Sequence, residues 1–148
     1  MSELSLSQFA DAVSEIMPVI AREFFRREET SFVKLKMTLP QFLVLVLLNK
    51  SGESSMSYMA SGLGVTTAAM TGIVDRLVRD GYIAREHDKD DRRVVNIALT
   101  VKGSKMVKTM LEKRKHMIAS IFSTLTQDER DQYLRILTRV RDALTVVK

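Results

Sequence analysis

Residues 55–81 of the 148-residue chain, SMSYMASGLGVTTAAMTGIVDRLVRDG, decide the fold. A short helical pattern covers residues 55–63, and Gly64 follows it as a residue that is free to take a positive φ. Thr66 is of a type that caps helix N-termini, and the helical pattern after it continues to Asp80 and stops at Gly81. We therefore expect a helix-turn-helix, in which a short helix braces a second, capped helix.

A predicted β-hairpin follows this pair of helices directly. Residues 82–86 and 94–99 read as strands, and the second strand alternates Val95, Ile97 and Leu99 with smaller or polar residues. A hairpin in this place makes the winged variant of the helix-turn-helix. Its second helix enters a major groove of DNA, while the hairpin reaches the neighbouring minor groove.

Helices are expected on both sides of this unit. The N-terminal helix should end near residues 27–30, and its apolar stripe consists of Leu6, Phe9, Val13, Ile16, Met17, Ile20 and Phe24. Residues 38–41 form a capping pair with proline in the first turn, and residues 42–48 are apolar on nearly every side, as in a central core helix.

Two more helices are expected after the hairpin. Thr100 can cap the first of them, which has the stripe Val107, Leu111, Ile118, Phe122 and Leu125. A capping box at residues 126–129 opens a last helix with the stripe Leu134, Leu137, Val140 and Leu144.

The length and composition fit one globular domain, or one domain with helical extensions. The net charge of +5 favours a polyanionic partner. The chain has no cysteine, which excludes disulfides, thiolate metal sites and thiol-based sensing. No apolar run is long enough to cross a bilayer, and the first residues do not resemble a secretion signal. We therefore expect a cytoplasmic protein without membrane contact.

The outward face of the predicted second helix carries small side chains at its start. Met70, Ile73, Val74 and Leu77 form the inward stripe. The outward residues are Thr67, Ala68, Thr71, Gly72, Arg76 and Arg79. Small side chains allow close approach to base edges, with hydroxyls from threonine and a methyl contact from alanine to thymine. Close packing of the helix inside the protein explains the same residues equally well.

The loop between the strands, residues 87–93, concentrates Lys89, Arg92 and Arg93. An arginine at a hairpin tip suits the negative potential of a narrow minor groove, and Asp90 or Asp91 could orient it. A charged loop taken alone is usually only solvated. Its position directly after a capped helix pair favours contact with DNA.

Other candidate sites have simpler explanations. His87 with Asp88, Asp90 and Asp91 lies in a solvated turn, which is a poor metal cage, so no metal site is predicted. His116 has no partner at catalytic spacing, and the methionines of the fifth helix are expected to fill the core. No Walker motif, dinucleotide fingerprint or nucleophile elbow is present. The sequence predicts neither an enzyme nor a cofactor.

Residues 37–103 resemble the MarR family of bacterial and archaeal regulators. The resemblance is carried by TLPQFLVLVLL (residues 38–48), MASGLGVTTAAMTGIVDRLVRDGYI (residues 59–83) and DKDDRRVVNIALTVKG (residues 88–103). The D-x-R wing signature of the family corresponds to Asp91-Arg92-Arg93, and its L-T-x-x-G element to residues 99–103. Gly72, where many relatives carry a longer side chain, and Gly62 in the supporting helix depart from the family pattern.

The resemblance implies a mainly α (α+β) fold, a winged helix-turn-helix with N- and C-terminal dimerisation helices. The expected parts are residues 1–35 and 103–148 for dimerisation and residues 36–102 for DNA binding. The residues expected at DNA are Thr66, Thr67, Ala68, Thr71, Gly72, Arg76, Lys89, Asp91, Arg92 and Arg93. Among them, Arg93 is placed in the minor groove and Arg76 near phosphate, with Asp75 as a brace for the wing. The residues expected in the dimer interface are Leu6, Phe9, Val13, Leu134, Leu137, Val140 and Leu144.

The function that follows is a homodimeric regulator, in most cases a repressor, bound to a pseudopalindromic operator in double-stranded DNA. Relatives often release DNA when a small anionic or phenolic effector binds between the helical region and the winged domain. The alternative is a winged-helix module that binds another protein instead of DNA, since small outward residues also suit a contact between helices.

Overall fold

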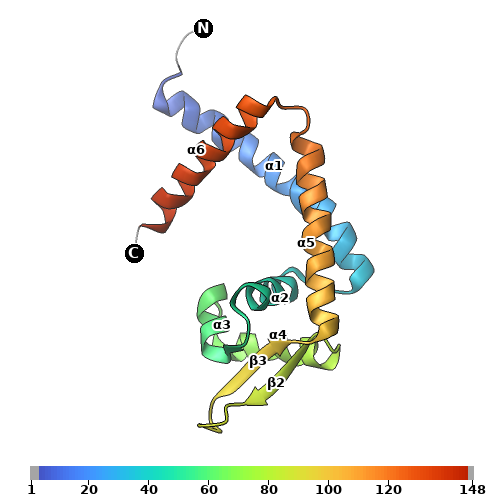
Figure 1. Cartoon of the computed structure of the whole chain (residues 1–148). Coiled ribbons are helices and arrows are strands. Elements are labelled where there is room, and N and C mark those ends of the chain that lie inside the picture. The colour runs from blue at the N-terminus through green and yellow to red at the C-terminus, as the bar shows by residue number, and fades with distance from the viewer. Residues whose placement is uncertain (1–3, 147–148) are drawn as a thin grey trace. The chain divides into compact units, whose positions relative to one another are not determined.

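The structure is a computed structural model that describes residues 4–146, without the side chains of residues 30 and 31. The described chain is mainly helical with one small sheet, as predicted, and Figure 1 shows its elements in order. They are α1 (Leu6–Leu35), α2 (Leu39–Ser51), β1 (Ser54–Ser55), α3 (Met56–Leu63), α4 (Thr67–Arg79), β2 (Ile83–His87), β3 (Val95–Leu99), α5 (Val101–Phe122) and α6 (Gln127–Thr145).

The chain divides into two compact units. The first unit, Met1–Met110, contains the helix-turn-helix, the sheet and the first part of α5. The second unit, Leu111–Lys148, contains the rest of α5 and α6.

Helix α2 lies at the centre of the core of the first unit, as its apolar composition predicts. Its N-terminus is closed by the predicted capping box, in which Thr38 and Gln41 each bond to the backbone of the other. Phe42 contacts the ring of Phe32 at the end of α1, with 5.5 Å between the ring centroids. The fully buried side chains around α2 come from α3, α4, β3 and α5, and include Met59, Met70, Leu77, Ile97 and Val107. Burial of side chains of this size typically stabilises a fold by about 1.5–3 kcal/mol each.

The sheet has three antiparallel strands in the order β1-β3-β2. The predicted hairpin is present, with Ile83 opposite Leu99 and His87 opposite Val95. Strand β1 was not predicted, because its two residues are too few to show an alternating pattern. Ser54 of β1 is buried and pairs with Ile97, so the segment before α3 is tied to the centre of the sheet.

Two of the predicted helix ends are wrong. Helix α1 continues past residues 27–30 to Leu35, because that stretch holds no glycine or proline and the helix ends only where Lys36 adopts a left-handed conformation (φ 50). The N–H of Lys36 bonds there to the carbonyls of Phe32 and Val33. Helix α5 ends at Phe122, so Leu125 lies in the following turn and not in the stripe of α5.

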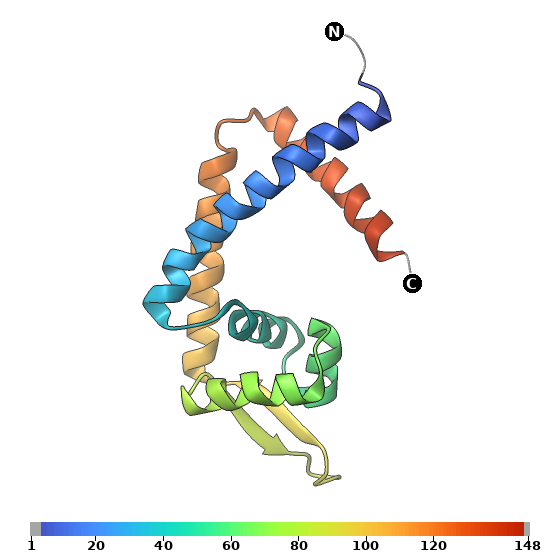
Figure 2. The same ribbon diagram turned by 180° about the vertical axis from the view of Figure 1, so that it is seen from behind.

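The hairpin and helices α2, α3 and α4 group together in the first unit. In the views from both sides, the loop end of the hairpin projects beyond these helices (Figures 1 and 2). The hairpin loop is therefore free to reach a partner that also contacts α4.

In the second unit, the predicted capping box is confirmed: the N–H of Glu129 bonds to the Thr126 hydroxyl oxygen, and the Glu129 carboxylate accepts from the Thr126 N–H. The bonds that this carboxylate accepts from the N–H and the hydroxyl of Thr126 lower the pKa of Glu129. The rings of Phe122 and Tyr133 lie 5.2 Å apart and connect α5 to α6. Within residues 4–146, no single helix is long and apolar enough to span a membrane, and only α1 and α2 together, across a bend of 89°, reach that length.

Candidate nucleic-acid interface

Helix α4 presents the predicted outward residues to solvent. The hydroxyl oxygen of Thr66 accepts the N–H of Ala69 at 3.1 Å and caps the helix, as predicted. Met70, Val74 and Leu77 are buried and fix the rotation of the helix. The opposite side is exposed, and it carries Thr66, Thr67, Ala68, Thr71, Gly72 and Arg76.

Two helical glycines in this region have different surroundings. The comparison bears on whether small side chains serve packing within the protein or contact with a partner. A Cβ added to Gly62 of α3 would lie 2.9 Å from Cδ2 of Leu47, so this glycine permits α3 to pack on α2. A Cβ added to Gly72 would meet no atom of the described residues within 4 Å. Gly72 also does not have a positive φ, although glycine in a helix costs about 1 kcal/mol relative to alanine. Neither packing within the described chain nor backbone conformation therefore requires glycine at position 72.

The hydroxyl groups on this face are not equally available. The hydroxyl of Thr71 donates to the carbonyl oxygen of Thr67 at 2.9 Å, so its proton is already used. The hydroxyl oxygen of Thr66 is used in the cap. Thr67 has an exposed hydroxyl for which the described part of the chain shows no hydrogen bond. To a partner, this face of α4 therefore offers methyl groups, open space at Gly72 and the hydroxyl of Thr67.

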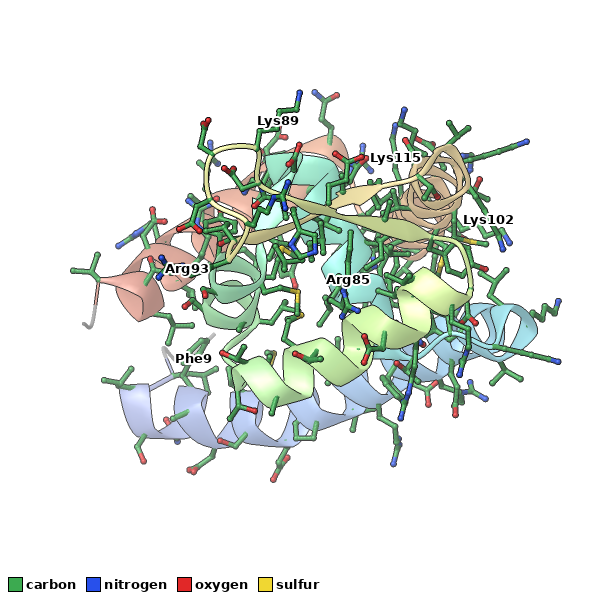
Figure 3. All side chains as sticks on the ribbon, turned by 90° about the horizontal axis from the view of Figure 1, so that it is seen from below. Phe9, Arg85, Lys89, Arg93, Lys102 and Lys115 are labelled. Carbon is green, nitrogen blue, oxygen red and sulfur yellow. The ribbon has the colours of Figure 1, made fainter. Side chains whose placement is uncertain are left out.

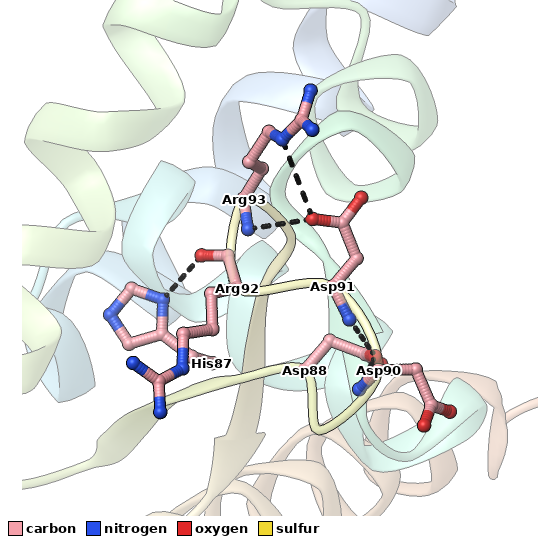
Figure 4. A network of polar contacts seen from close by, with 6 residues as sticks. All are labelled: His87, Asp88, Asp90, Asp91, Arg92 and Arg93. Carbon is pink, nitrogen blue, oxygen red and sulfur yellow. Dashed lines mark hydrogen bonds and ion pairs between the residues drawn. The ribbon is translucent and has the colours of Figure 1, made fainter.

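The loop of the hairpin is organised by Asp88. One carboxylate oxygen of Asp88 accepts the backbone N–H groups of Asp90 and Asp91, at 2.8 and 3.1 Å (Figure 4). The other oxygen accepts from the Asn96 amide at 3.4 Å. The two backbone bonds lower the pKa of Asp88 below its usual value. Sequence reasoning considered Asp88 only as a metal ligand and missed this role. An aspartate that starts a tight turn was the available signal.

Arg93 extends from this loop into solvent. Its side chain is 96% exposed, and Oδ1 of Asp91 accepts its backbone N–H at 3.0 Å and lies 3.8 Å from Nε (Figure 4). His87 Nδ1 lies 3.0 Å from the carbonyl oxygen of Arg92 across the base of the loop. Lys89 and Arg92 are also exposed, so the loop presents three cations to a partner.

An ion pair connects helix α4 to the hairpin. Nη2 of Arg85, on β2, lies 2.5 Å from Oδ1 of Asp75 on α4. Asp75 was expected to brace the wing, but its partner was not identified from the sequence. Arg85 lies two residues after the buried Ile83 on the same strand, and therefore on the same face of the sheet, which was the signal for it. Figure 3 shows Arg85 between α4 and the hairpin, while Lys89 and Arg93 lie at the loop end of the hairpin.

The connection from β3 to α5 is fixed by side chains that form hydrogen bonds with backbone atoms. The Thr100 hydroxyl donates to the carbonyl of Gly81 at 2.7 Å and accepts the N–H of Gly103 at 3.0 Å. Nζ of Lys102 donates to the carbonyl of Asp80 at 2.7 Å and lies 4.6 Å from the centroid of the Tyr82 ring. These bonds fix the end of α4, the start of the hairpin and the start of α5 together.

The residues predicted for a dimer interface belong to other elements, α1 and α6. Leu6, Phe9 and Val13 of α1 are exposed, and so are Leu134, Leu137, Val140 and Leu144 of α6. These apolar side chains are thus open to solvent in the described residues, and their place in a dimer interface stays a prediction.

The chain is similar to known transcriptional regulators. Residues 37–95 match the model of the MarR family. Over 113 residues the chain is 34% identical to the HTH-type transcriptional repressor MdtR of Bacillus subtilis, covering 76% of this chain and 73% of MdtR. It is 33% identical to the HTH-type transcriptional regulator YfiV of the same organism, over 74% of this chain and 71% of YfiV.

Solved structures share the fold over nearly the whole chain. The structure of RV1404 from Mycobacterium tuberculosis is 30% identical, covers 97% of both chains and has a TM-score of 0.82. A mutant of MepR from S. aureus, solved bound to an oligodeoxyribonucleotide, is 25% identical, covers 88% of this chain and 96% of its own, and has a TM-score of 0.67.

Proposed function

The chain belongs to the MarR family of winged helix-turn-helix transcriptional regulators, which are DNA-binding proteins and not enzymes, and we propose that it is a repressor that binds a pseudopalindromic operator as a homodimer. A regulator of this kind acts in the cytoplasm, where the chromosome of a bacterium or archaeon lies. The proposed parts are residues 36–102 for DNA binding, and residues 1–35 and 103–148 for dimerisation.

The observation that carries the proposal is the exposed face of α4 with open space at Gly72. The missing side chain at position 72 serves no contact within the described chain, and it lets the helix approach base edges closely. We place Thr66, Thr67, Ala68, Thr71 and Gly72 in the major groove. Arg76, one turn further along α4, is placed at phosphate.

The wing supplies the second part of the contact. Arg93, extended from the hairpin loop and held by Asp91, enters the adjacent minor groove in this proposal. Lys89 and Arg92 neutralise phosphates beside it. Phosphate contacts of this kind supply much of the affinity and make it fall steeply with salt.

Homodimerisation is supported by the exposed apolar stripes. Leu6, Phe9 and Val13 on α1, and Leu134, Leu137, Val140 and Leu144 on α6, are unusual on the surface of a monomer. A twofold dimer would place two α4 helices about one DNA turn apart and would therefore read a pseudopalindrome. Bound over a promoter, such a dimer blocks transcription, and the name of MdtR as a repressor supports this mode.

An effector is proposed on the family resemblance alone. Such a dimer would have one state in which the distance between its two α4 helices fits the operator and another in which it does not. A small anionic or phenolic molecule would release DNA if it bound the second state more tightly than the first. A titration of the DNA complex with a hydroxybenzoate tests this, because release at a saturable concentration is expected and unchanged affinity would remove this class of effector.

The test of the main proposal is selection of duplexes from a random pool by the purified protein, followed by a binding measurement at several salt concentrations. We expect enrichment of a pseudopalindrome and a logarithm of affinity that falls linearly with the logarithm of salt concentration. Footprinting of DNA upstream of the gene for this chain then locates the natural operator. No enrichment, together with salt-insensitive binding to another protein, would instead support a protein-interaction module.

A further inference from the structure

We propose that Arg85, oriented by Asp75, binds the phosphates of the DNA strand that separates the two grooves contacted by α4 and the wing. Sequence reasoning did not place Arg85 at DNA. The inference rests on the proposed function, because it requires α4 and the wing to occupy neighbouring grooves of one duplex.

The path of the DNA backbone leads to this assignment. A major groove and the minor groove next to it are separated by a single sugar-phosphate strand. If α4 lies in one groove and the hairpin loop in the other, that strand must cross the protein between α4 and the hairpin. Arg85 occupies this place: it starts from β2 and its Nη2 reaches Asp75 on α4 (Figure 3).

The ion pair leaves Arg85 able to bind a phosphate. A guanidinium group has five N–H donors in a planar fork, and the contact with Oδ1 of Asp75 involves only Nη2. The side chain of Arg85 is 35% exposed and that of Asp75 is 55% exposed, so the pair is open to solvent and not part of the core. The other edges of the guanidinium can therefore donate to phosphate oxygens in the bidentate way that arginine favours.

The ion pair also offsets an unfavourable negative charge on α4. Asp75 carries a negative charge on the helix that must approach the DNA polyanion. Arg85 neutralises this charge, and Asp75 in turn holds the guanidinium in one orientation before DNA arrives. Pre-orientation of this kind reduces the entropy that is lost when the contact forms.

The alternative is that the pair only braces the hairpin against α4, and the two roles differ in their salt dependence. Removal of a phosphate contact weakens binding to all sequences and reduces the slope of log affinity against log salt by about 1. Removal of a brace weakens binding without changing the number of phosphates that are neutralised. We therefore measure both quantities for Arg85→Ala, with Arg85→Gln as a second variant that keeps most of the side chain.

The matched control is Arg139→Ala, which removes an exposed arginine on the side of α6 that faces away from the apolar stripe. We expect Arg85→Ala and Arg85→Gln to weaken binding to the selected duplex by about tenfold, with the smaller salt slope, and Arg139→Ala to change neither. Thermal unfolding should be nearly unchanged in all three variants, because exposed ion pairs contribute little stability. An unchanged salt slope in both Arg85 variants would overturn the proposal.

A second experiment locates the contact on the DNA. Single phosphates of the selected duplex are replaced by uncharged methylphosphonate, one position at a time. Wild-type protein should lose affinity at the phosphates between the major-groove and minor-groove contacts, whereas Arg85→Ala should be insensitive at those positions only. Equal losses for wild type and variant at every position would overturn the assignment of Arg85, while failure of the wild-type protein to bind any duplex would overturn the proposed function itself.

Discussion

Gly72 and Gly103 are both helical glycines, yet their surroundings give them different roles. An added Cβ has open space at Gly72, whereas at Gly103 of α5 it would collide with the carbonyl oxygen of Tyr82. Gly103 is thus required by the contact between α5 and the start of the hairpin. Gly72 is required by nothing within the described chain, and we propose that its role is in contact with a partner.

The first prediction concerns Gly72→Glu. A carboxylate at this position would approach the phosphates and fill the space that the base edges need, so we expect the affinity for the selected duplex to fall by about tenfold or more. Fluorescence anisotropy with a labelled duplex measures this. Gly72→Ala is the control, and it should affect binding much less. Tight binding by Gly72→Glu would mean that another face of α4 contacts DNA.

A second prediction compares the same change at two helical positions. Gly103→Ala should lower the free energy of unfolding by about 2 kcal/mol, because the backbone of Tyr82 must move. Gly72→Ala should raise it by up to about 1 kcal/mol, because alanine is the better helix former and its methyl group meets no neighbour. Urea unfolding measures both values. Effects of the same sign would contradict the different roles assigned to Gly72 and Gly103.

The sequence could predict which residues of α4 face outward, because Met70, Val74 and Leu77 set the period of the helix. It could not decide between DNA contact and internal packing for the small residues, since that depends on neighbours distant in sequence. The contrast between Gly62 against Leu47 and Gly72 in open space supplies the missing information. The partner of Asp75 was hidden for the same reason, because Arg85 lies on a different element.

At the scale of elements, the wing is a hairpin whose loop is shaped by its own aspartates. Asp88 holds the backbone of Asp90 and Asp91, and Asp91 holds the backbone of Arg93. The acidic residues of the loop therefore set the direction in which its cations extend.

The third prediction concerns the wing. Arg93→Ala should weaken binding across duplex sequences by about tenfold, because a minor-groove arginine contributes electrostatic affinity, and it should leave the dimer intact. Binding titrations and sedimentation measure the two properties. Lys108→Ala on α5, which removes one exposed cation elsewhere in the first unit, is the control. If Arg93→Ala and Lys108→Ala bind alike at moderate salt, the wing does not contact DNA as proposed.

Local sequence signals predicted most element starts and failed at some ends. The caps at Thr38, Thr66 and Thr126 are confirmed, because each is set by residues within one turn. The end of α1 was wrong, since Lys36 takes a left-handed conformation that its residue type does not favour. Strand β1 exists only through its pairing with β3, so no pattern within its two residues could reveal it.

For the molecule as a whole, the proposed function requires two copies of the chain. The stripes on α1 and α6 are apolar at helical spacing, yet their side chains are exposed in the single chain. Burial of these stripes in the proposed homodimer would explain the apolar pattern.

The fourth prediction concerns this dimer. Leu137→Asp or Leu144→Asp would place a charge in the interface, where it has no partner to offset its desolvation, so we expect the dimer dissociation constant to rise by about a hundredfold or more. Analytical ultracentrifugation measures it. Gln132→Asp, on a different face of α6, introduces the same charge and should leave the dimer unchanged. If both leucine variants sediment like the wild-type protein, these residues do not lie in the dimer interface.

The proposed function requires α4 and the wing to occupy adjacent grooves of one duplex, and protection of the DNA from dimethyl sulfate tests this. The reagent methylates guanine N7 in the major groove and adenine N3 in the minor groove, so one experiment reports on both. We predict protected guanines in a major-groove segment, protected adenines in the minor groove beside it, and the same pattern in a second half-site about one turn away. Tight binding with protection in only one of the two grooves would contradict the account.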